Sequence, residues 1–153
     1  MRFDNLQEWL EWQASLHPKT IELGLARSLK VWQSLGAPRI ANTLVSVAGT
    51  NGKGSSIAFL ENIYLSAGYK VGAYTSPHLL DYTERLRIGG EQIDEHRFCK
   101  AFAAIDSARG DTSLTYFEFG TLAVFLIMSE YHLDIAVLEV GLGGRLDAVN
   151  IVD

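Results

Sequence analysis

The sequence has little cysteine, little proline and no long apolar run. It contains one cysteine, Cys99, and three prolines. A single cysteine excludes an internal disulfide and a cysteine-based metal cluster, so we expect Cys99 to fill a small space in the core. The longest wholly apolar run, Leu122 to Met128, is too short to cross a bilayer, and the segment from Met1 to Glu8 is too polar for a signal peptide. We therefore expect no membrane partner and a cytoplasmic location.

Basic residues are also scarce. The chain has 13 lysines and arginines against 18 aspartates and glutamates, a formal net charge of −5, and no basic run. Nucleic-acid binding needs basic patches that neutralise phosphates, so this composition argues against nucleic acid as a main partner. The 153 residues, 48% of them hydrophobic, suit a single domain with a real core.

One stretch carries a strong chemical pattern. A β-branched apolar run from Leu44 to Val47 leads into the glycine-rich segment GTNGKGS, Gly49 to Ser55, which we call the phosphate loop. Glycines let the backbone turn its N–H groups inward, and the helix that follows points its positive end at the same place. Lys53 adds a charge that can reach the β- and γ-phosphates, and a serine hydroxyl can bind Mg²⁺.

The sequence of this loop differs from the common phosphate-loop motif, in which GxxxxGK is followed directly by serine or threonine. Here Val47 stands five residues before Gly52, and Gly54 follows Lys53. A plain glycine-rich turn between strand and helix is the alternative. A lysine just inside the helix, flanked by glycines after a buried strand, favours nucleotide binding.

The flanking segments alternate between helix and strand patterns. Apolar spacing predicts helices over 3–16 and 25–35, and a third helix after the loop. The buried face of that third helix is predicted to hold Ile57, Leu60, Ile63, Tyr64 and Ala67. A second strand follows at Lys70 to Tyr74, and a strand, helix and strand in this order form a parallel βαβ unit. The fold class we predict is α/β, a mostly parallel sheet that contains the phosphate loop and is flanked by helices.

The rest of the chain extends this architecture. Residues 86–93 suggest a hairpin or surface loop, and Asp94 can cap a helix that buries Phe98, Phe102 and Ile105. Thr115 and Glu118 fit a capping box before a nearly all-apolar helix over 119–131. A third strand runs from Asp134 to Glu139. Three parallel strands alone would leave the edges of the sheet uncovered.

Candidate functional residues stand where these strands end. Glu139 closes its strand at the level of the phosphate loop, where a carboxylate can hold Mg²⁺; capping of nearby N–H groups is the alternative. Ser76 and His78 follow the second strand, at the edge where open parallel sheets place their ligands. By themselves these two residues indicate only a turn and a hydrogen-bonded loop histidine.

Five segments of the chain form a specific combination. They are GTNGKGS (49–55), TSPHL (75–79), YTERLRI (82–88), SLTYFEFGTL (113–122) and LEVGLGGRLDAVNIVD (138–153). Together they resemble the bifunctional dihydrofolate synthase/folylpolyglutamate synthase family of Mur-type ATP-dependent ligases, and the similarity runs in order from about residue 17 to the end of the chain.

The resemblance implies a ligase that uses ATP and Mg²⁺ and acts on dihydropteroate, reduced folates and L-glutamate. ATP would phosphorylate a substrate carboxylate, and the amine of glutamate would displace phosphate to form an amide. Because the carboxylate and the γ-phosphate are both negative, Mg²⁺, Lys53 and the loop N–H groups must neutralise them.

The resemblance also implies roles for individual residues. Lys53 would be catalytic. The ATP site would comprise Gly49, Thr50, Asn51, Gly52, Lys53, Gly54 and Ser55. Ser76, Glu139 and Ser55 would bind metal. The pteroate pocket would be lined by Thr115, Tyr116, Phe117, Glu118, Leu146, Asp147 and Ala148, with Thr20, Ile21 and Glu22 as a further wall.

In this family a further strand, a metal-binding histidine, a lysine and a second domain follow. We therefore expect residues 1–153 to be the amino-terminal part of the ATP-binding domain, with the C-terminal domain absent and little or no ligase activity. The full-length protein is expected to be a monomer. A nucleotide-dependent switch and a small-molecule kinase are the alternative functions.

Overall fold

A five-stranded sheet in the order β1-β5-β2-β3-β4 forms the framework of the chain in this computed structural model, which describes residues 2–18 and 22–152. The strands are β1 (Ala41–Val47), β2 (Val71–Tyr74), β3 (Leu86–Ile88), β4 (Glu91–Gln92) and β5 (Leu133–Glu139). β5 pairs in parallel with both β1 and β2, whereas β3 pairs antiparallel with β2 and β4. The α/β class and the mostly parallel core of the sheet are confirmed.

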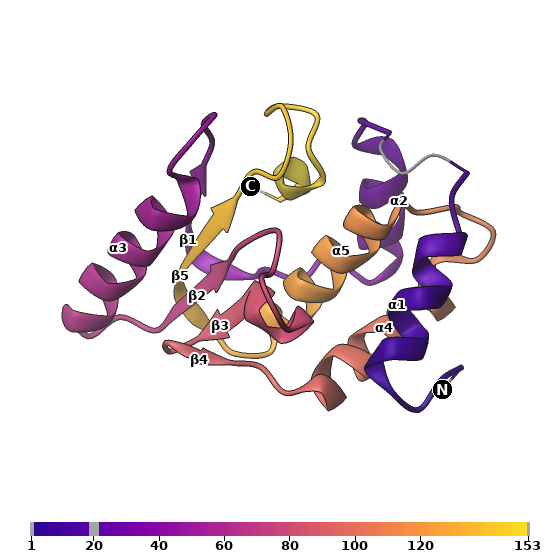
Figure 1. Ribbon diagram of the computed structural model, residues 1–153, viewed down its shortest axis with the longest axis horizontal. Coiled ribbons are helices and arrows are strands. Elements are labelled where there is room, and N and C mark those ends of the chain that lie inside the picture. The colour runs from indigo at the N-terminus through magenta and orange to yellow at the C-terminus, as the bar shows by residue number, and fades with distance from the viewer. Residues whose placement is uncertain (1, 19–21, 153) are drawn as a thin grey trace.

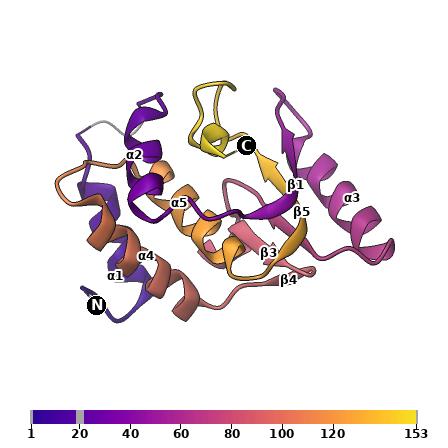
Figure 2. The same cartoon turned by 180° about the vertical axis from the view of Figure 1, so that it is seen from behind.

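Helices lie on both sides of this sheet (Figures 1 and 2). They are α1 (Leu6–Ser15), α2 (Ala26–Ser34), α3 (Lys53–Ser66), α4 (Glu95–Arg109) and α5 (Tyr116–Ser129), with the short 3₁₀ helices η1 (Tyr82–Arg85) and η2 (Ala148–Ile151). α3 covers one side alone, while the other four helices gather on the opposite side. None of the helices in the described residues has the length and apolarity that a membrane span needs.

Local sequence signals cap the starts of α4 and α5 as expected, although α5 begins at Tyr116 and α1 at Leu6, each three residues from its predicted start at 119 or 3. Asp94 accepts the N–H of Arg97 at the start of α4. Thr115 and Glu118 form the predicted capping box of α5, in which each side chain accepts the other residue's backbone N–H (3.2 and 2.8 Å). These caps satisfy N–H groups that a helix start leaves without partners.

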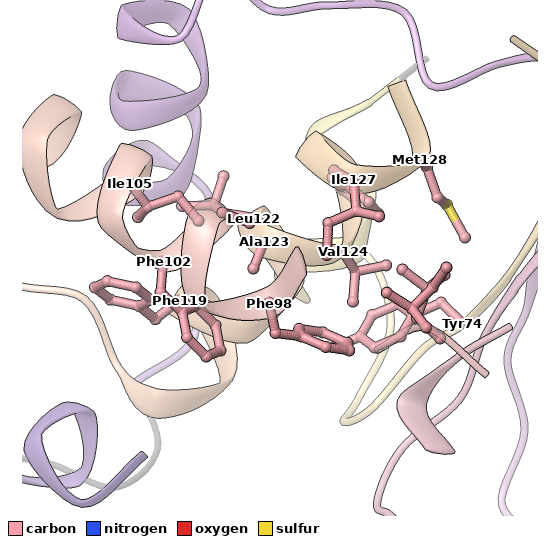
Figure 3. Close-up of a cluster of buried hydrophobic side chains, with 14 of the residues drawn as sticks. Tyr74, Phe98, Phe102, Ile105, Phe119, Leu122, Ala123, Val124, Ile127 and Met128 are labelled. Atoms are coloured by element: carbon pink, nitrogen blue, oxygen red, sulfur yellow. The ribbon is translucent and has the colours of Figure 1, made fainter. Parts of the chain in front are cut away.

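The main core lies between the sheet and the four-helix side (Figure 3). The predicted stripe of Phe98, Phe102 and Ile105 on α4 is fully buried, and Cys99 is buried beside it. α5 is buried almost all round, as its composition predicts. This rigid centre fixes the first turn of α5 relative to the carboxyl ends of β2 and β5.

The prediction for α3 is partly wrong. Ile57 is buried, but Ile63 is 60% exposed and Ala67 is also exposed. Only a narrow stripe of α3 touches the sheet, and Glu61 lies on it, 4% exposed, with its carboxylate paired to the Arg87 guanidinium of β3 at 2.7 Å. Leu60 and Tyr64 are half-buried against the sheet, so the buried stripe of α3 is narrower than the apolar pattern predicts.

The segment at 86–93 is the hairpin of β3 and β4, and it joins the main sheet. β3 pairs with β2, so one of the sheet edges that we expected to be open is covered. β1 remains at the other edge within the described residues.

Candidate functional site

The phosphate loop joins β1 to α3 at the carboxyl end of the parallel strands, the same end at which the segment after β5 lies (Figure 1). Gly52 is the N-cap of α3 and has φ of 76°, a left-handed conformation that favours glycine. Gly49, Thr50, Asn51, Gly54 and Ser55 are all exposed. The start of α3 therefore presents its backbone N–H groups to solvent, as binding of an anion requires.

Lys53, Ser76 and Glu139 meet beside this loop. The Nζ of Lys53 donates to the carbonyl of Gly49 (3.1 Å) and lies 3.9 Å from Oε1 of Glu139. The other carboxylate oxygen, Oε2, accepts the backbone N–H of Ser76 at 2.9 Å. Three residues that are far apart in the sequence thus converge, because β1, β5 and β2 are neighbours in the sheet.

This convergence suits a divalent cation that is shared with a nucleotide. Mg²⁺ in nucleotide sites takes one or two carboxylates, and phosphates and water supply its other ligands. The described residues contain no cluster of three or more histidine, cysteine, aspartate or glutamate side chains that could hold a metal. The Glu139 carboxylate, 6% exposed, and the hydroxyl of Ser76 are donors of the chemistry that Mg²⁺ prefers. Ser55 is exposed in the first turn of α3.

A cavity of about 320 Å³ opens on the other side of Ser76. Most of the residues expected around pteroate line it, namely Glu22, Thr115, Phe117, Glu118, Leu146, Asp147 and Ala148. Tyr116 does not belong to this lining; its ring lies edge-on to that of Tyr82, 6.2 Å away. Thr20 and Ile21 lie outside the described residues.

The walls of this cavity are closely fitted. The ring of Phe117 stacks on Tyr74, with centroids 6.5 Å apart and planes at 22°. A Cβ on Gly141 would come within 2.7 Å of the Phe117 ring, so only glycine leaves room for the aromatic wall. The cavity therefore has a flat aromatic face, which suits a planar ligand.

Asp147 is the most enclosed carboxylate of the cavity, at 2% exposed. It accepts the N–H groups of Leu142 (2.8 Å) and Val149 (3.0 Å). Burial raises its pKa above the usual range, while these hydrogen bonds act in the opposite direction. Burial likewise raises the pKa of the neighbouring Tyr74 to about 12, so its hydroxyl stays protonated and can remain bonded to Thr121.

A second wall comes from the segment before α2. Arg27 binds both carboxylate oxygens of Glu118 (3.0 and 3.3 Å) and the backbone carbonyl of Glu22 (2.9 Å). The N–H of Gly24 donates to the carbonyl of Leu146 (3.2 Å). These contacts hold residues 22–24 over the start of α5 and against the segment after β5.

Sequence reasoning missed several lining residues. They are Leu23, Gly24, Pro77, Arg85, Gly141 and Leu142, together with Ser76, which was expected only at the metal. Arg85 belongs to the segment YTERLRI, which carried part of the resemblance without a role being assigned. Its Nε donates to Nδ1 of His78 (2.9 Å), and burial together with this guanidinium lowers the pKa of His78.

Comparison with known proteins identifies what the chain is similar to. No family model matches the sequence. Dihydrofolate synthase/folylpolyglutamate synthase from Escherichia coli (strain K12) is 53% identical over 148 residues, which are 97% of this chain and 35% of that relative. The chain thus spans 35% of that relative's length, and the share is 34% for the protein of the same name from Haemophilus influenzae, which is 46% identical.

Solved structures give the same result. E. coli FolC in complex with DHPP and ADP superposes with a TM-score of 0.96 at 53% identity, over 98% of this chain and 36% of that one. The observed fold is therefore the fold of that protein over the shared residues.

Proposed function

We propose that this chain, which is 53% identical to dihydrofolate synthase/folylpolyglutamate synthase from Escherichia coli over the part that it spans, belongs to that family. It would form the nucleotide- and pteroate-binding part of a ligase that adds L-glutamate to dihydropteroate and to reduced folates. Residues 1–153 would be the amino-terminal part of the ATP-binding domain. The whole protein would consume ATP and form the amide through an acyl phosphate.

The phosphate loop would bind the nucleotide. Its N–H groups and the positive end of α3 favour the phosphates, and Lys53 would place a cation beside the phosphate that is transferred. Lys53 is held between the Gly49 carbonyl and Glu139. It is therefore already positioned at the mouth of the loop.

Glu139 and Ser76 would hold Mg²⁺, with Ser55 as a further hydroxyl ligand. A divalent cation there would neutralise phosphate charge while a carboxylate approaches. The hydrogen bond from the backbone N–H of Ser76 to Oε2 fixes the orientation of the Glu139 carboxylate, and Oε1 faces Lys53. The role that this chain contributes is to keep these donors in place.

The cavity would hold the pteroate substrate. Phe117 offers a flat face for the heterocycle, and Asp147 is a buried acceptor for its N–H groups. The single observation that carries the proposal is that Ser76 belongs both to this cavity and to the Glu139 contact beside the phosphate loop. An acid bound in the cavity would therefore reach the nucleotide.

The observation also favours a ligase over the alternatives. A nucleotide-dependent switch needs no cavity for a flat ligand beside the loop. A small-molecule kinase would share the cavity, but it would not require glutamate. Glutamate-dependent release of ADP by the protein therefore separates the kinase from the ligase.

The direct experiment is calorimetric titration of the chain with dihydropteroate, repeated with Phe117→Ala. We expect the wild-type chain to bind and Phe117→Ala to lose about 2 kcal/mol of binding free energy or more, the scale of a buried aromatic contact. Leu29→Ala, which removes an exposed apolar side chain on α2, is the control. Equal affinity in the wild type and Phe117→Ala would reject the cavity as the pteroate site.

We also propose that the full-length protein is a monomer in the cytoplasm and that it has no nucleic-acid or membrane partner. The acidic net charge of −5 supports the expectation for nucleic acid. Analytical ultracentrifugation of the protein tests the expected monomer.

A further inference from the structure

A buried cation lines the wall of the cavity that includes Ser76. Arg85 ends η1 and is 7% exposed, and its side chain belongs to the cavity lining. Its backbone carbonyl accepts the N–H of Thr75 at 2.9 Å, the residue just before Ser76. The position of Arg85 is therefore tied to the end of β2, where the cavity adjoins the Glu139 contact.

The side chains that touch this guanidinium bring no negative charge. Nε donates to Nδ1 of His78, and the guanidinium carbon lies 4.9 Å from the ring centroid of Tyr82 and 5.7 Å from that of Tyr116. Among residues 2–18 and 22–152, no carboxylate oxygen lies within 4.0 Å of the Arg85 nitrogens.

The two most buried carboxylates of the cavity have other partners. Glu118 binds Arg27 and accepts the N–H of Thr115. Asp147 accepts the N–H groups of Leu142 and Val149. Neither carboxylate forms an ion pair with Arg85, so the positive charge of Arg85 is balanced by no contact within the described part of the chain.

A charge removed from water is costly unless an opposite charge or hydrogen-bond acceptors replace the water. The Nδ1 of His78 and the hydroxyl of Tyr74 give neutral contacts to the guanidinium. With the aromatic faces of Tyr82 and Tyr116, they supply only part of that compensation. A bound anion would supply the rest, and a guanidinium binds a carboxylate well because two parallel N–H groups match its two oxygens. The unbalanced cation thus indicates an acidic ligand.

We propose that Arg85 binds the carboxylate of the aromatic acid that occupies the cavity. Arg85 thereby orients the ligand, with its ring system against Phe117 and its carboxylate toward Ser76 and the phosphate loop. The inference rests on the proposed function, since the acid is the pteroate whose carboxylate reacts. Arg85 would also reduce the repulsion between that carboxylate and the nucleotide phosphates.

The test compares two ligands and three variants. The ligands are dihydropteroate and its counterpart without the carboxyl group, in which aniline replaces p-aminobenzoate. The variants are Arg85→Met, which keeps the length of the side chain and removes its charge, Arg85→Lys, and the control Arg97→Met on the exposed face of α4. Dissociation constants come from calorimetry, and circular dichroism checks that each variant is folded.

We expect Arg85→Met to weaken dihydropteroate binding about ten- to hundred-fold, the range of a charge-assisted hydrogen bond, and to change binding of the carboxyl-free ligand no more than about two-fold. Arg85→Lys should lose less affinity for dihydropteroate, and the loss should again be confined to this acid. If Arg85→Met does not fold, Arg85→Lys provides the test. Arg97→Met should bind both ligands as the wild type does.

Four results would overturn the inference. If Arg85→Met loses equal affinity for both ligands, Arg85 contacts the ring system or only supports the wall of the cavity. If its affinity for dihydropteroate is unchanged, Arg85 does not bind the carboxylate. A wild-type chain that binds neither ligand would reject the proposed function and the inference with it. Binding of both ligands with equal affinity would reject the Arg85 inference alone.

Discussion

At the scale of single residues, the site depends on a lysine and a glutamate that already lie together. The Nζ of Lys53 is 3.9 Å from Oε1 of Glu139 and donates to the carbonyl of Gly49. An incoming phosphate would replace these partners with a stronger one, because charge-assisted hydrogen bonds to phosphate are short and strong.

Lys53→Ala should therefore weaken binding of Mg·ATP about ten- to hundred-fold, with no comparable loss for dihydropteroate. Lys100→Ala, an exposed lysine on α4, is the matched control. Calorimetric titration measures both variants. An unchanged affinity for ATP in Lys53→Ala would contradict every role given to the phosphate loop.

Glu139→Gln should reduce the dependence of nucleotide binding on Mg²⁺, because an amide keeps the shape of the carboxylate but loses its charge. The amide oxygen of the glutamine can still accept the hydrogen bond from the backbone N–H of Ser76, so the variant should fold. Titration of ATP with and without Mg²⁺ gives the measurement. A Mg²⁺ effect equal to that in the wild type would remove Glu139 from the metal site.

Asp147 should make the stability of the chain depend on pH in an unusual direction. Burial raises its pKa in the folded chain, so the folded state binds this proton more tightly than the unfolded state does. The contribution of Asp147 to stability is then fully present below its ordinary pKa of 3.8 and is lost as pH rises through the raised value.

Chemical unfolding of the wild type and Asp147→Asn at several acid pH values tests this sign. The free energy of unfolding of the wild type minus that of Asp147→Asn should fall as pH increases through this range, since the other carboxylates cancel in the difference. A difference that rises with pH would mean that the hydrogen bonds from Leu142 and Val149 outweigh burial.

At the scale of the elements, α5 is the helix on which both the core and the cavity are built. Its first turn carries Thr115, Phe117 and Glu118 into the cavity, and its later turns are buried in the core. The contact between α5 and η1 is especially close, because a Cβ on Gly120 would come within 2.5 Å of the Tyr82 hydroxyl.

Gly120→Ala should lower the free energy of unfolding by about 1–3 kcal/mol, the cost of overpacking, despite the better helix propensity of alanine. The ring of Tyr82 cannot move away easily, since it is 4% exposed and packs against Phe98 and Phe102. Thermal and chemical unfolding give the measurement.

Tyr82→Phe supplies the control, because the Tyr82 hydroxyl is buried and has no hydrogen-bond partner in the described residues. Removing it should leave stability unchanged or raise it. In the Tyr82→Phe background, Gly120→Ala should lose most of its penalty. A penalty of the same size in both backgrounds would contradict the steric explanation.

Arg27 joins the wall at 22–24 to α5. Arg27→Met would leave the Glu118 carboxylate, 3% exposed, without its cation, so we expect a loss of about 2–4 kcal/mol in unfolding free energy. At a temperature where the variant is folded, its affinity for dihydropteroate should fall while its affinity for ATP stays near that of the wild type. Equal losses for both ligands would show general damage instead of a displaced wall.

The elements that sequence reasoning placed well are those with local signals. The capping box of Thr115 and Glu118, the strand that ends at Glu139 and the stripe of Phe98 and Phe102 each depend on residues close together in the chain. The pairing of β3 with β2 and the burial of Glu61 depend on distant partners, and for these the pattern gave no signal or a wrong one.

The same distinction holds for the candidate site. The residue pattern indicated the phosphate loop and Glu139, and the family resemblance added Ser76 and most of the cavity lining. It assigned no role to Arg85, because the importance of that residue lies in a buried charge whose surroundings only the folded chain reveals.

At the scale of the whole molecule, β5 is the strand that joins the two halves of the site. It pairs with β1, which leads to the phosphate loop, and with β2, which leads to Ser76 and the cavity. Glu139 at its end contacts both, through Lys53 on one side and Ser76 on the other. Ligands on the two sides should therefore influence each other.

The most direct test of this account is calorimetric titration of the chain with dihydropteroate in the absence and presence of saturating Mg·ATP, and the reverse. We predict that both ligands bind and that each changes the affinity for the other by the same factor, as reciprocal coupling requires. Binding of Mg·ATP with no binding of dihydropteroate under either condition would contradict the central claim that the cavity and the phosphate loop form one site.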